Sequence, residues 1–172
     1  MNDNPDIEVD ATFLSDQSEV FEELMRTVSW DESMRSRKTA SFGKPYDYSQ
    51  MRYPDRQMPV CLQSVLQQLE TRLDIPFNNC LLNLYETGEN AMGFHSDETR
   101  NLLNGTGIAI VSLGSERTIS FRSIDQTTNV DYRLIPGSML YMSAEVQHHW
   151  MHAVKKRIGA GRRISLTCRA IQ

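Results

Sequence analysis

The stretch GIAIVSLGSERTISFRS (107–123) holds two short apolar runs, 107–114 and 117–123, that meet at a Gly-Ser-Glu segment. Isoleucine, valine, threonine and phenylalanine are enriched in strands because they pack well on a pleated surface. Glycine followed by serine between such runs is a signal for a tight turn. The stretch therefore predicts two strands that are separated by a tight turn.

Similar runs surround this stretch. Short strands are predicted at 78–88, 130–135, 138–143 and 162–171, and a Pro-Gly pair at 136–137 marks another turn. Many short strands without helices between them favour a sandwich or jelly roll. Two helices are predicted earlier, over about 16–30 and 60–73, where apolar residues recur at helical spacing. The expected fold class is mainly β with N-terminal helices, arranged as a jelly roll.

Length and composition fit one globular domain. The chain has 172 residues, of which 40% are hydrophobic and 23% are charged, as is ordinary for a soluble domain. Residues 1–11 are polar and acidic and are expected to be flexible, and residues 12–172 are expected to form the domain. No run of about 18 apolar residues is present, so no membrane span is expected.

The cysteines and the charge distribution narrow the class of protein. Three cysteines without a C-x-x-C spacing favour a reducing compartment, so we expect a cytoplasmic protein, or a nuclear one in a eukaryote. Residues 1–34 carry a net charge of −9, whereas residues 35–172 carry +5. A mildly basic body permits nucleic-acid binding through a local patch, but it is equally compatible with a solvated surface.

The segment GFHSD (93–97) contains a candidate metal pair. His95 and Asp97 are two residues apart, so on an extended strand both side chains project to the same face. A histidine from the segment QHHWMH, which holds His148, His149 and His152, could complete two histidines and one carboxylate. That facial set leaves open positions on a non-haem iron. A structural turn remains an alternative for an isolated H-x-D pair.

The segment RISLTCR (163–169) adds a second candidate feature. Strand alternation places Arg163, Ser165, Thr167 and Arg169 on one face and apolar residues on the other. A guanidinium that faces a pocket needs a negative partner, and its planar fork binds a carboxylate with two parallel hydrogen bonds. An iron site beside such an arginine suggests an oxidative enzyme with a keto-acid cosubstrate. The alternative is that both arginines are exposed residues of a strand.

Together these motifs resemble the AlkB-type iron(II)/2-oxoglutarate dioxygenases. The resemblance rests on H-x-D at 95–97, a distant His152, and two arginines six residues apart at 163 and 169. FNNCLLNLYETG (77–88), RKTASFGKPYDYS (37–49) and PGSMLYMS (136–143) resemble other segments of the family, in the family's order. The likeness covers roughly residues 35–171.

The resemblance implies a fold, cofactors and roles for particular residues. It implies a double-stranded β-helix, and a catalytic Fe(II) held by His95, Asp97 and His152. It implies 2-oxoglutarate and O2 as further cofactors. The 2-oxoglutarate site would use Arg163 with Tyr85 at the distal carboxylate, and Arg169 with Asn83 at the chelating end. Ser165 stands where the family often has asparagine, and it too is expected to bind the cosubstrate.

The implied activity is oxidative demethylation of N-alkylated nucleobases in DNA or RNA, giving succinate, CO2 and formaldehyde. The expected partner is alkylated single-stranded DNA or RNA, with no membrane and no obligate protein partner. A substrate lid is expected at about 35–57, since aromatic and basic side chains suit bases and phosphates. The candidate substrate residues are Arg37, Phe42, Tyr46, Tyr48, Glu98 and Thr99.

Thr99 departs from the family pattern, because several members carry an acidic residue there that helps to read the base. Base identity is therefore open. Two alternatives remain beside nucleobase repair. One is the same oxygenase chemistry on a tRNA base, a protein or a small molecule. The other is a non-catalytic binding module on a jelly roll, since a fold does not fix a function.

Overall fold

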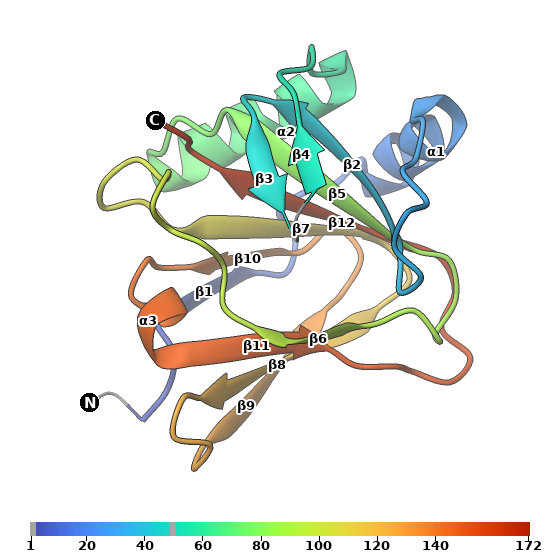
Figure 1. The fold of residues 1–172 in the computed structure, drawn as a ribbon. Coiled ribbons are helices and arrows are strands. Elements are labelled where there is room, and N and C mark those ends of the chain that lie inside the picture. Colours follow the sequence, from blue (N-terminus) through green and yellow to red (C-terminus); the bar gives the residue numbers. More distant parts are fainter. Residues whose placement is uncertain (1–2, 49–50) are drawn as a thin grey trace.

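Three layers make up the protein in the computed structural model, which describes residues 3–48 and 51–172, with the backbone alone described for Tyr48 and Met51. Two helices form the outer layer, a six-stranded sheet lies beneath them, and a four-stranded sheet faces the other side of that sheet (Figure 1). This arrangement agrees with the predicted fold class.

The large sheet is entirely antiparallel and has the strand order β1-β10-β7-β12-β5-β2. In that order its strands are Ile7–Asp10, Met139–Met142, Ile108–Gly114, Arg163–Arg169, Asn79–Tyr85 and Lys38–Gly43. The predicted C-terminal strand, β12, lies in the middle of the sheet. Both of its neighbours therefore fix its register, which determines which side chains face the inside of the molecule.

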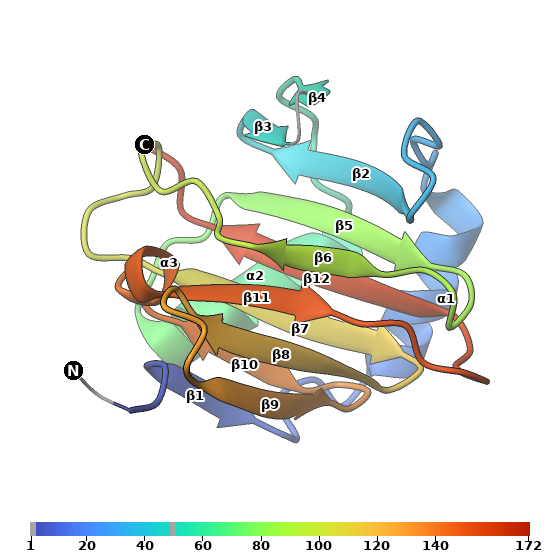
Figure 2. The same ribbon diagram turned by 60° about the horizontal axis from the view of Figure 1, so that its bottom comes forward.

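The small sheet has the order β6-β11-β8-β9 and is also antiparallel (Figure 2). Its strands are Met92–His95, Trp150–Val154, Arg117–Ser123 and Asn129–Leu134. A one-turn helix, α3 (Val146–His149), leads directly into β11. A hairpin of β3 (Tyr46–Tyr48) and β4 (Met51–Tyr53) follows β2. The predicted lid region thus contains an edge strand of the large sheet followed by this hairpin.

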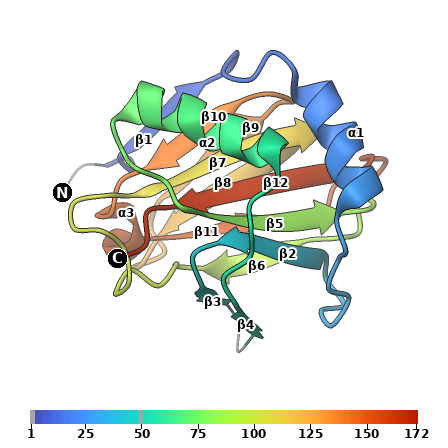
Figure 3. The same cartoon turned by 90° about the horizontal axis from the view of Figure 1, so that it is seen from above.

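The helices cover the outer face of the large sheet. Helices α1 (Gln17–Thr27) and α2 (Val60–Leu73) both lie over it (Figure 3). Leu24 of α1 and Leu62 and Leu69 of α2 are fully buried there. The bounds of α2 match the prediction, whereas α1 is shorter at its C-terminal end. No helix within the described ranges combines the length and the apolar character that crossing a membrane would require.

A second core fills the space between the two sheets, and β12 shows how the sequence divides the two cores. Ile164, Leu166 and Cys168 pack on the helix side. Arg163, Ser165 and Arg169 face the inter-sheet space, although every residue of the strand is buried. The alternation predicted for this strand is therefore confirmed, and its polar face looks inward.

Two glycines make the turns that the sequence predicts. Gly114 ends β7 with a φ of +81°, and Gly137 precedes β10 with a φ of +82°. Residues that carry a side chain rarely adopt this left-handed backbone conformation, whereas glycine adopts it freely. At Gly114 a Cβ atom would also stand 2.5 Å from the carbonyl oxygen of Arg162. A side chain at position 114 is thus disfavoured by both conformation and space.

The N-terminal segment differs from the expectation of a flexible tail over residues 1–11. Residues 7–10 form β1, which pairs with β10 at the edge of the large sheet. Ile7 packs against the inner core, while Glu8 and Asp10 form ion pairs with Arg72 of α2. A four-residue strand gives a weak signal in the sequence, because its formation depends on pairing with β10, which lies about 130 residues later in the chain.

Candidate active site

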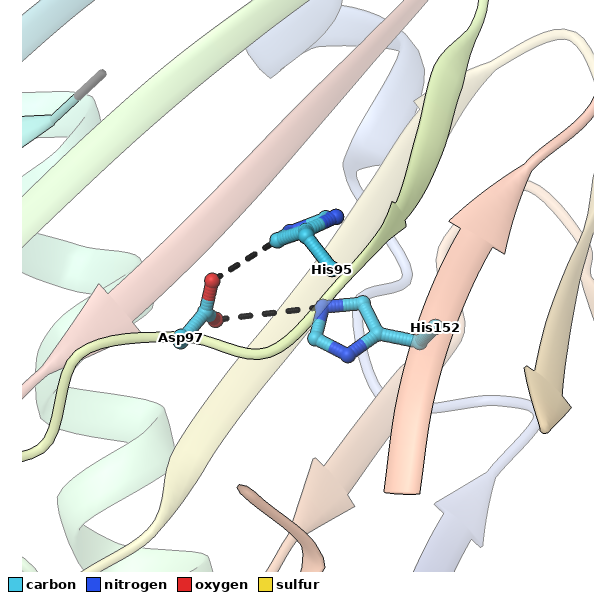
Figure 4. Close-up of side chains that lie close together, drawn as sticks. All are labelled: His95, Asp97 and His152. Carbon is cyan, nitrogen blue, oxygen red and sulfur yellow. Dashed lines mark ion pairs between the residues drawn. The ribbon is translucent and has the colours of Figure 1, made fainter. Parts of the chain in front are cut away.

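The two histidines of the candidate metal site lie on adjacent strands. His95 ends β6 and His152 is central in β11, and antiparallel pairing sets them directly opposite each other. Asp97 follows β6 and turns its carboxylate toward both imidazoles (Figure 4). Its Oδ1 lies 3.3 Å from His95 Nε2, and its Oδ2 lies 3.9 Å from His152 Nε2.

The spacing of these donor atoms suits one shared cation. One ligand atom from each of the three residues lies within 4.8 Å of the others. Donors that are about 2 Å from one metal ion must lie within about 4 Å of one another, so small side-chain adjustments complete the site. Within the described ranges, His152 Nδ1 is buried and has no hydrogen-bond partner. The structure therefore brings together the three residues that the sequence predicted as metal ligands, namely His95, Asp97 and His152.

Asp97 is held in its anionic form. Burial by itself would raise the pKa of this carboxyl, but Arg169 and the two histidines outweigh burial and hold the pKa below its usual value. The Arg169 Nη2 donates to Asp97 Oδ2 across 3.2 Å. Asp97 therefore offers a carboxylate to a cation near neutral pH.

The two imidazoles have different environments. Burial lowers the pKa of His152 to about 4, so its ring is neutral and keeps a lone pair near neutral pH. For His95, burial also favours the neutral ring, but the carboxylate of Asp97 outweighs burial and raises the pKa. Its Nδ1 lies 2.8 Å from the carbonyl oxygen of Gly93, which directs Nε2 toward Asp97.

Gln147 fixes the turn that presents Asp97. This buried side chain of α3 accepts a hydrogen bond from the backbone N–H of Asp97 across 2.7 Å. Its Nε2 donates to the sulfur of Met142. Ser96 Oγ donates to the carbonyl oxygen of Trp150, which lies two residues before His152. These bonds join the H-x-D turn to the strand that carries the second histidine.

Replacing Gln147 with leucine is expected to weaken Fe(II) binding about tenfold, because loss of an orienting hydrogen bond commonly costs 10- to 100-fold in metal affinity. Gln147→Glu keeps an acceptor oxygen and should retain more of the affinity. His148→Leu, at an exposed neighbour, is the matched control. Anaerobic Fe(II) titration of the three variants measures the effect, and equal affinity in wild type and Gln147→Leu would remove Gln147 from the account.

All of the candidate catalytic, metal and cosubstrate residues line one cavity between the sheets. They are His95, Asp97, His152, Asn83, Tyr85, Arg163, Ser165 and Arg169. Register explains the grouping, because Arg163 pairs with Tyr85 and Ser165 with Asn83 across β12 and β5. Apolar side chains such as Leu81, Ile110 and Leu134 complete the walls.

Arg163 marks one end of the cavity and Arg169 marks the metal end. Arg163 is fully buried, and its Nη2 donates to Ser112 Oγ across 3.1 Å. In the described part of the chain, its Nε and Nη1 have no hydrogen-bond partner. Burial lowers the pKa of Arg163 to about 10, so the group still carries its charge near neutral pH. A buried cation with unused donors suits a carboxylate ligand.

The candidate substrate residues are more scattered. Arg37 donates from Nε to Asn83 Oδ1 across 2.8 Å, and Asn83 lines the cavity. The ring of Tyr46 lies 4.0 Å from the Arg169 guanidinium, at the metal end. Phe42 is buried on the helix side of the large sheet. The side chain of Tyr48 lies outside the described residues. The substrate roles of Arg37, Tyr46 and Tyr48 remain predictions, whereas the buried position of Phe42 contradicts the role predicted for it.

Glu98 and Thr99 follow the candidate ligand Asp97. The exposed Glu98 carboxylate accepts hydrogen bonds from the backbone N–H groups of Thr99 and Arg100, and it also pairs with the Arg100 side chain. These contacts hold the acidic group against its own turn. Substrate roles for Glu98 and Thr99 also remain predictions.

The family model of the 2OG-Fe(II) oxygenase superfamily matches residues 6–169. The chain belongs to this superfamily. Membership implies Fe(II), 2-oxoglutarate and O2, and it confirms the predicted enzyme class. The donor set fits such a cofactor, since two imidazoles and one carboxylate suit non-haem Fe(II). The unused donors of the buried Arg163 likewise fit a dicarboxylic cosubstrate.

Relatives of this 2OG-Fe(II) oxygenase place it near the AlkB group and confirm that resemblance. The chain is 29% identical to the bovine alpha-ketoglutarate-dependent dioxygenase alkB homolog 3, over 92% of this chain and 63% of the relative. It is 31% identical to the bovine DNA oxidative demethylase ALKBH2, over 78% of this chain and 53% of the relative. The chain thus spans somewhat over half the length of these curated relatives.

The solved structure of OsALKBH1 superimposes with a TM-score of 0.73 at 18% identity, covering 97% of both chains. At this identity the likeness concerns the fold. It confirms the double-stranded β-helix that the sequence predicts for this oxygenase.

Two contributors to the site were not identified from sequence. Ser112 had a signal, because it is the one polar residue on the inward face of β7, where Ile108 and Ile110 also point. Gln147 gave no such signal in the sequence, because residue spacing does not show that α3 lies beside the H-x-D turn.

Proposed function

We propose that the protein is an Fe(II)- and 2-oxoglutarate-dependent dioxygenase that oxidatively demethylates N-alkylated nucleobases in single-stranded DNA or RNA. One observation carries the oxygenase part, namely that the His95, Asp97 and His152 cluster shares a cavity with the unsatisfied Arg163. The demethylase named among its relatives supports the substrate class. A cytoplasmic location, or a nuclear one in a eukaryote, accords with such a substrate.

Each group of cavity residues has a role in this proposal. His95, Asp97 and His152 would hold the iron, and Gln147 would orient the turn that presents the carboxylate. Arg163 would bind the distal carboxylate of 2-oxoglutarate, with Tyr85 beside it. Bound iron and cosubstrate would activate O2 for the oxidation of a substrate C–H bond. The apolar walls would keep water from the reacting atoms.

Asn83, Ser165 and Arg169 would act at the end of the cosubstrate that chelates the metal. Arg169 already neutralises Asp97, and Ser165 lies opposite Asn83 on the neighbouring strand. The Tyr46 ring covers the Arg169 guanidinium, so the β3–β4 hairpin reaches the metal end of the cavity. Arg37, Tyr46 and Tyr48 stay in the proposal as residues of the substrate side, together with Glu98 and Thr99. Phe42 does not, because it packs on the helix side of the large sheet.

A cluster of aromatic and basic residues beside the metal strand supports a nucleic-acid substrate. Phe94 immediately precedes His95, and strand alternation turns its ring to the opposite face. The Arg122 guanidinium lies 4.0 Å from the centre of that ring, and the Lys155 ammonium lies 5.6 Å from it. Cations beside an aromatic plane suit phosphates and stacked bases.

Oligonucleotides that carry 1-methyladenine or 3-methylcytosine test the proposal. Incubation with the Fe(II)-loaded protein, 2-oxoglutarate and O2 should remove one methyl group per lesion and release formaldehyde. Matched single-stranded DNA, single-stranded RNA and duplex substrates, read by mass spectrometry, rank the nucleic acids. Turnover should also fall steeply between about 50 and 200 mM salt, because phosphate contacts release counterions.

The control is 2-oxoglutarate turnover in the absence of oligonucleotide. Turnover of the cosubstrate without loss of methyl from any oligonucleotide would contradict the nucleobase proposal. It would favour the same chemistry on a protein or a small molecule. The pairing of Glu98 with Arg100 in its own turn is compatible with such a substrate. A protein that bound no Fe(II) would instead support a non-catalytic module.

A further inference from the structure

A further fully buried guanidinium, besides those of Arg163 and Arg169, lies outside the cavity lining. Arg117 opens β8 and is 0% exposed. Its Nη2 donates to the carbonyl oxygen of Asn90 across 2.7 Å and to that of Lys155 across 2.5 Å. Across the described ranges, its Nε and Nη1 are buried without a hydrogen-bond partner. Arg117 thus has both charge and donors that the protein alone does not satisfy.

Arg117 and Arg163 approach the same aromatic ring. The guanidinium carbon of each lies 5.2 Å from the centre of the Tyr85 ring. In the part of the chain that the structure describes, no ion pair joins either arginine to a carboxylate. The proximity of Arg117 contributes to the lowered pKa of Arg163, after the larger effect of burial. Two buried cations therefore lie beside one tyrosine ring, an arrangement that an anion would stabilise.

The contacts of Arg117 also suggest a purely structural role. Asn90 precedes β6 and Lys155 follows β11, so the hydrogen bonds tie together the strands that carry His95 and His152. A neutral amide could make such bonds without the cost of burying a charge. Linking the two strands accounts for the hydrogen bonds of Nη2. It does not account for the buried charge of Arg117 or for the Nε and Nη1 atoms that lack a hydrogen-bond partner.

We propose that Arg117 is a positioning residue for the cosubstrate, whose charge reinforces Arg163 and makes the site selective for 2-oxo acids with a distal carboxylate. The inference rests on the proposed 2-oxoglutarate-dependent function. Arg117 lies outside the cavity lining and acts through Tyr85 and Arg163. In an effective dielectric of about 20, a buried unit charge that lies near the ligand carboxylate without touching it changes affinity by about tenfold.

Two variants separate the charge of Arg117 from its hydrogen bonds. Arg117→Gln removes the charge but keeps an amide that can donate to the two carbonyl groups. Arg117→Lys keeps the charge. Arg133→Met, at an exposed arginine of the same sheet, is the control. Thermal unfolding and Fe(II) affinity of each variant report whether the strands are still tied together.

Calorimetric titration of the Fe(II)-loaded proteins without O2 compares 2-oxoglutarate with 2-oxopentanoate, which has the same chain length but no distal carboxylate. Arg117→Gln is expected to weaken 2-oxoglutarate about tenfold and to leave 2-oxopentanoate unchanged, while Arg117→Lys keeps most of the preference. Equal weakening of both ligands, or an unchanged preference, would overturn the role of Arg117. If Arg117→Gln does not fold, loss of the preference in Arg117→Lys would overturn it instead.

The wild-type protein separates this inference from the function on which it rests. A wild type without preference for 2-oxoglutarate over 2-oxopentanoate would contradict the cosubstrate assignment itself. A wild type with that preference, together with a normal preference in Arg117→Gln, would contradict the inference about Arg117 alone.

Discussion

Replacing His152 with alanine is expected to abolish tight Fe(II) binding and all turnover of 2-oxoglutarate. The variant loses one of three donors, and the remaining pair of His95 and Asp97 cannot alone form a facial set. The loss should exceed the roughly 100-fold effect that follows removal of an outer hydrogen-bond partner. Anaerobic Fe(II) titration and succinate formation measure the two quantities.

His149→Ala is the matched control for His152→Ala. His149 lies three residues earlier, is exposed and pairs with Glu145. It should bind Fe(II) as the wild type does, and thermal unfolding checks that both variants fold. An equal loss in both variants, or no loss in His152→Ala, would mean that the metal is held elsewhere.

Replacing Arg163 with methionine is expected to raise the dissociation constant for 2-oxoglutarate by at least about 30-fold. Removing one partner of a buried charged pair costs about 2–5 kcal/mol, and each 1.4 kcal/mol is tenfold in affinity. Fe(II) affinity should change little, because Arg163 lies away from the metal end of the cavity and Arg169 retains its contact with Asp97. Calorimetric titration of the Fe(II)-loaded variant measures the change.

Arg163→Met should be at least as stable as the wild type, even though it binds 2-oxoglutarate more weakly. Without cosubstrate, Arg163 is a buried cation that lacks a carboxylate among the described ion pairs; it donates a hydrogen bond to Ser112 and lies beside the Tyr85 ring. An apolar side chain of similar size should leave the melting temperature unchanged or raise it. The exposed Arg162→Met is the control. Lower stability with normal 2-oxoglutarate affinity would assign Arg163 to the core alone.

Much of the site follows from the sequence because a strand has a strict period of two. The alternation of 163–169 fixed which residues share a face, and the two flanking strands leave β12 no other register. The choice of His152 among three neighbouring histidines came from the family resemblance rather than from spacing. Its position opposite His95 depends on the pairing of β6 with β11, which no local pattern specifies.

Long-range contacts account for what the sequence did not reveal. Residues 7–10 were expected to be flexible, yet they add a strand to an edge that β10 provides. Gln147 and Arg117 form hydrogen bonds with backbone groups that are distant in sequence. Phe42 was expected on the substrate side because it is aromatic, whereas alternation along β2 turns its ring to the helices.

The most direct test of the account is anomalous diffraction at the iron edge, from crystals grown without O2 in the presence of Fe(II) and 2-oxoglutarate. The account predicts one iron peak within coordination distance of His95, Asp97 and His152. It also predicts 2-oxoglutarate in the same cavity, with its distal carboxylate on Arg163. An iron peak elsewhere, or no bound iron at all, would contradict it.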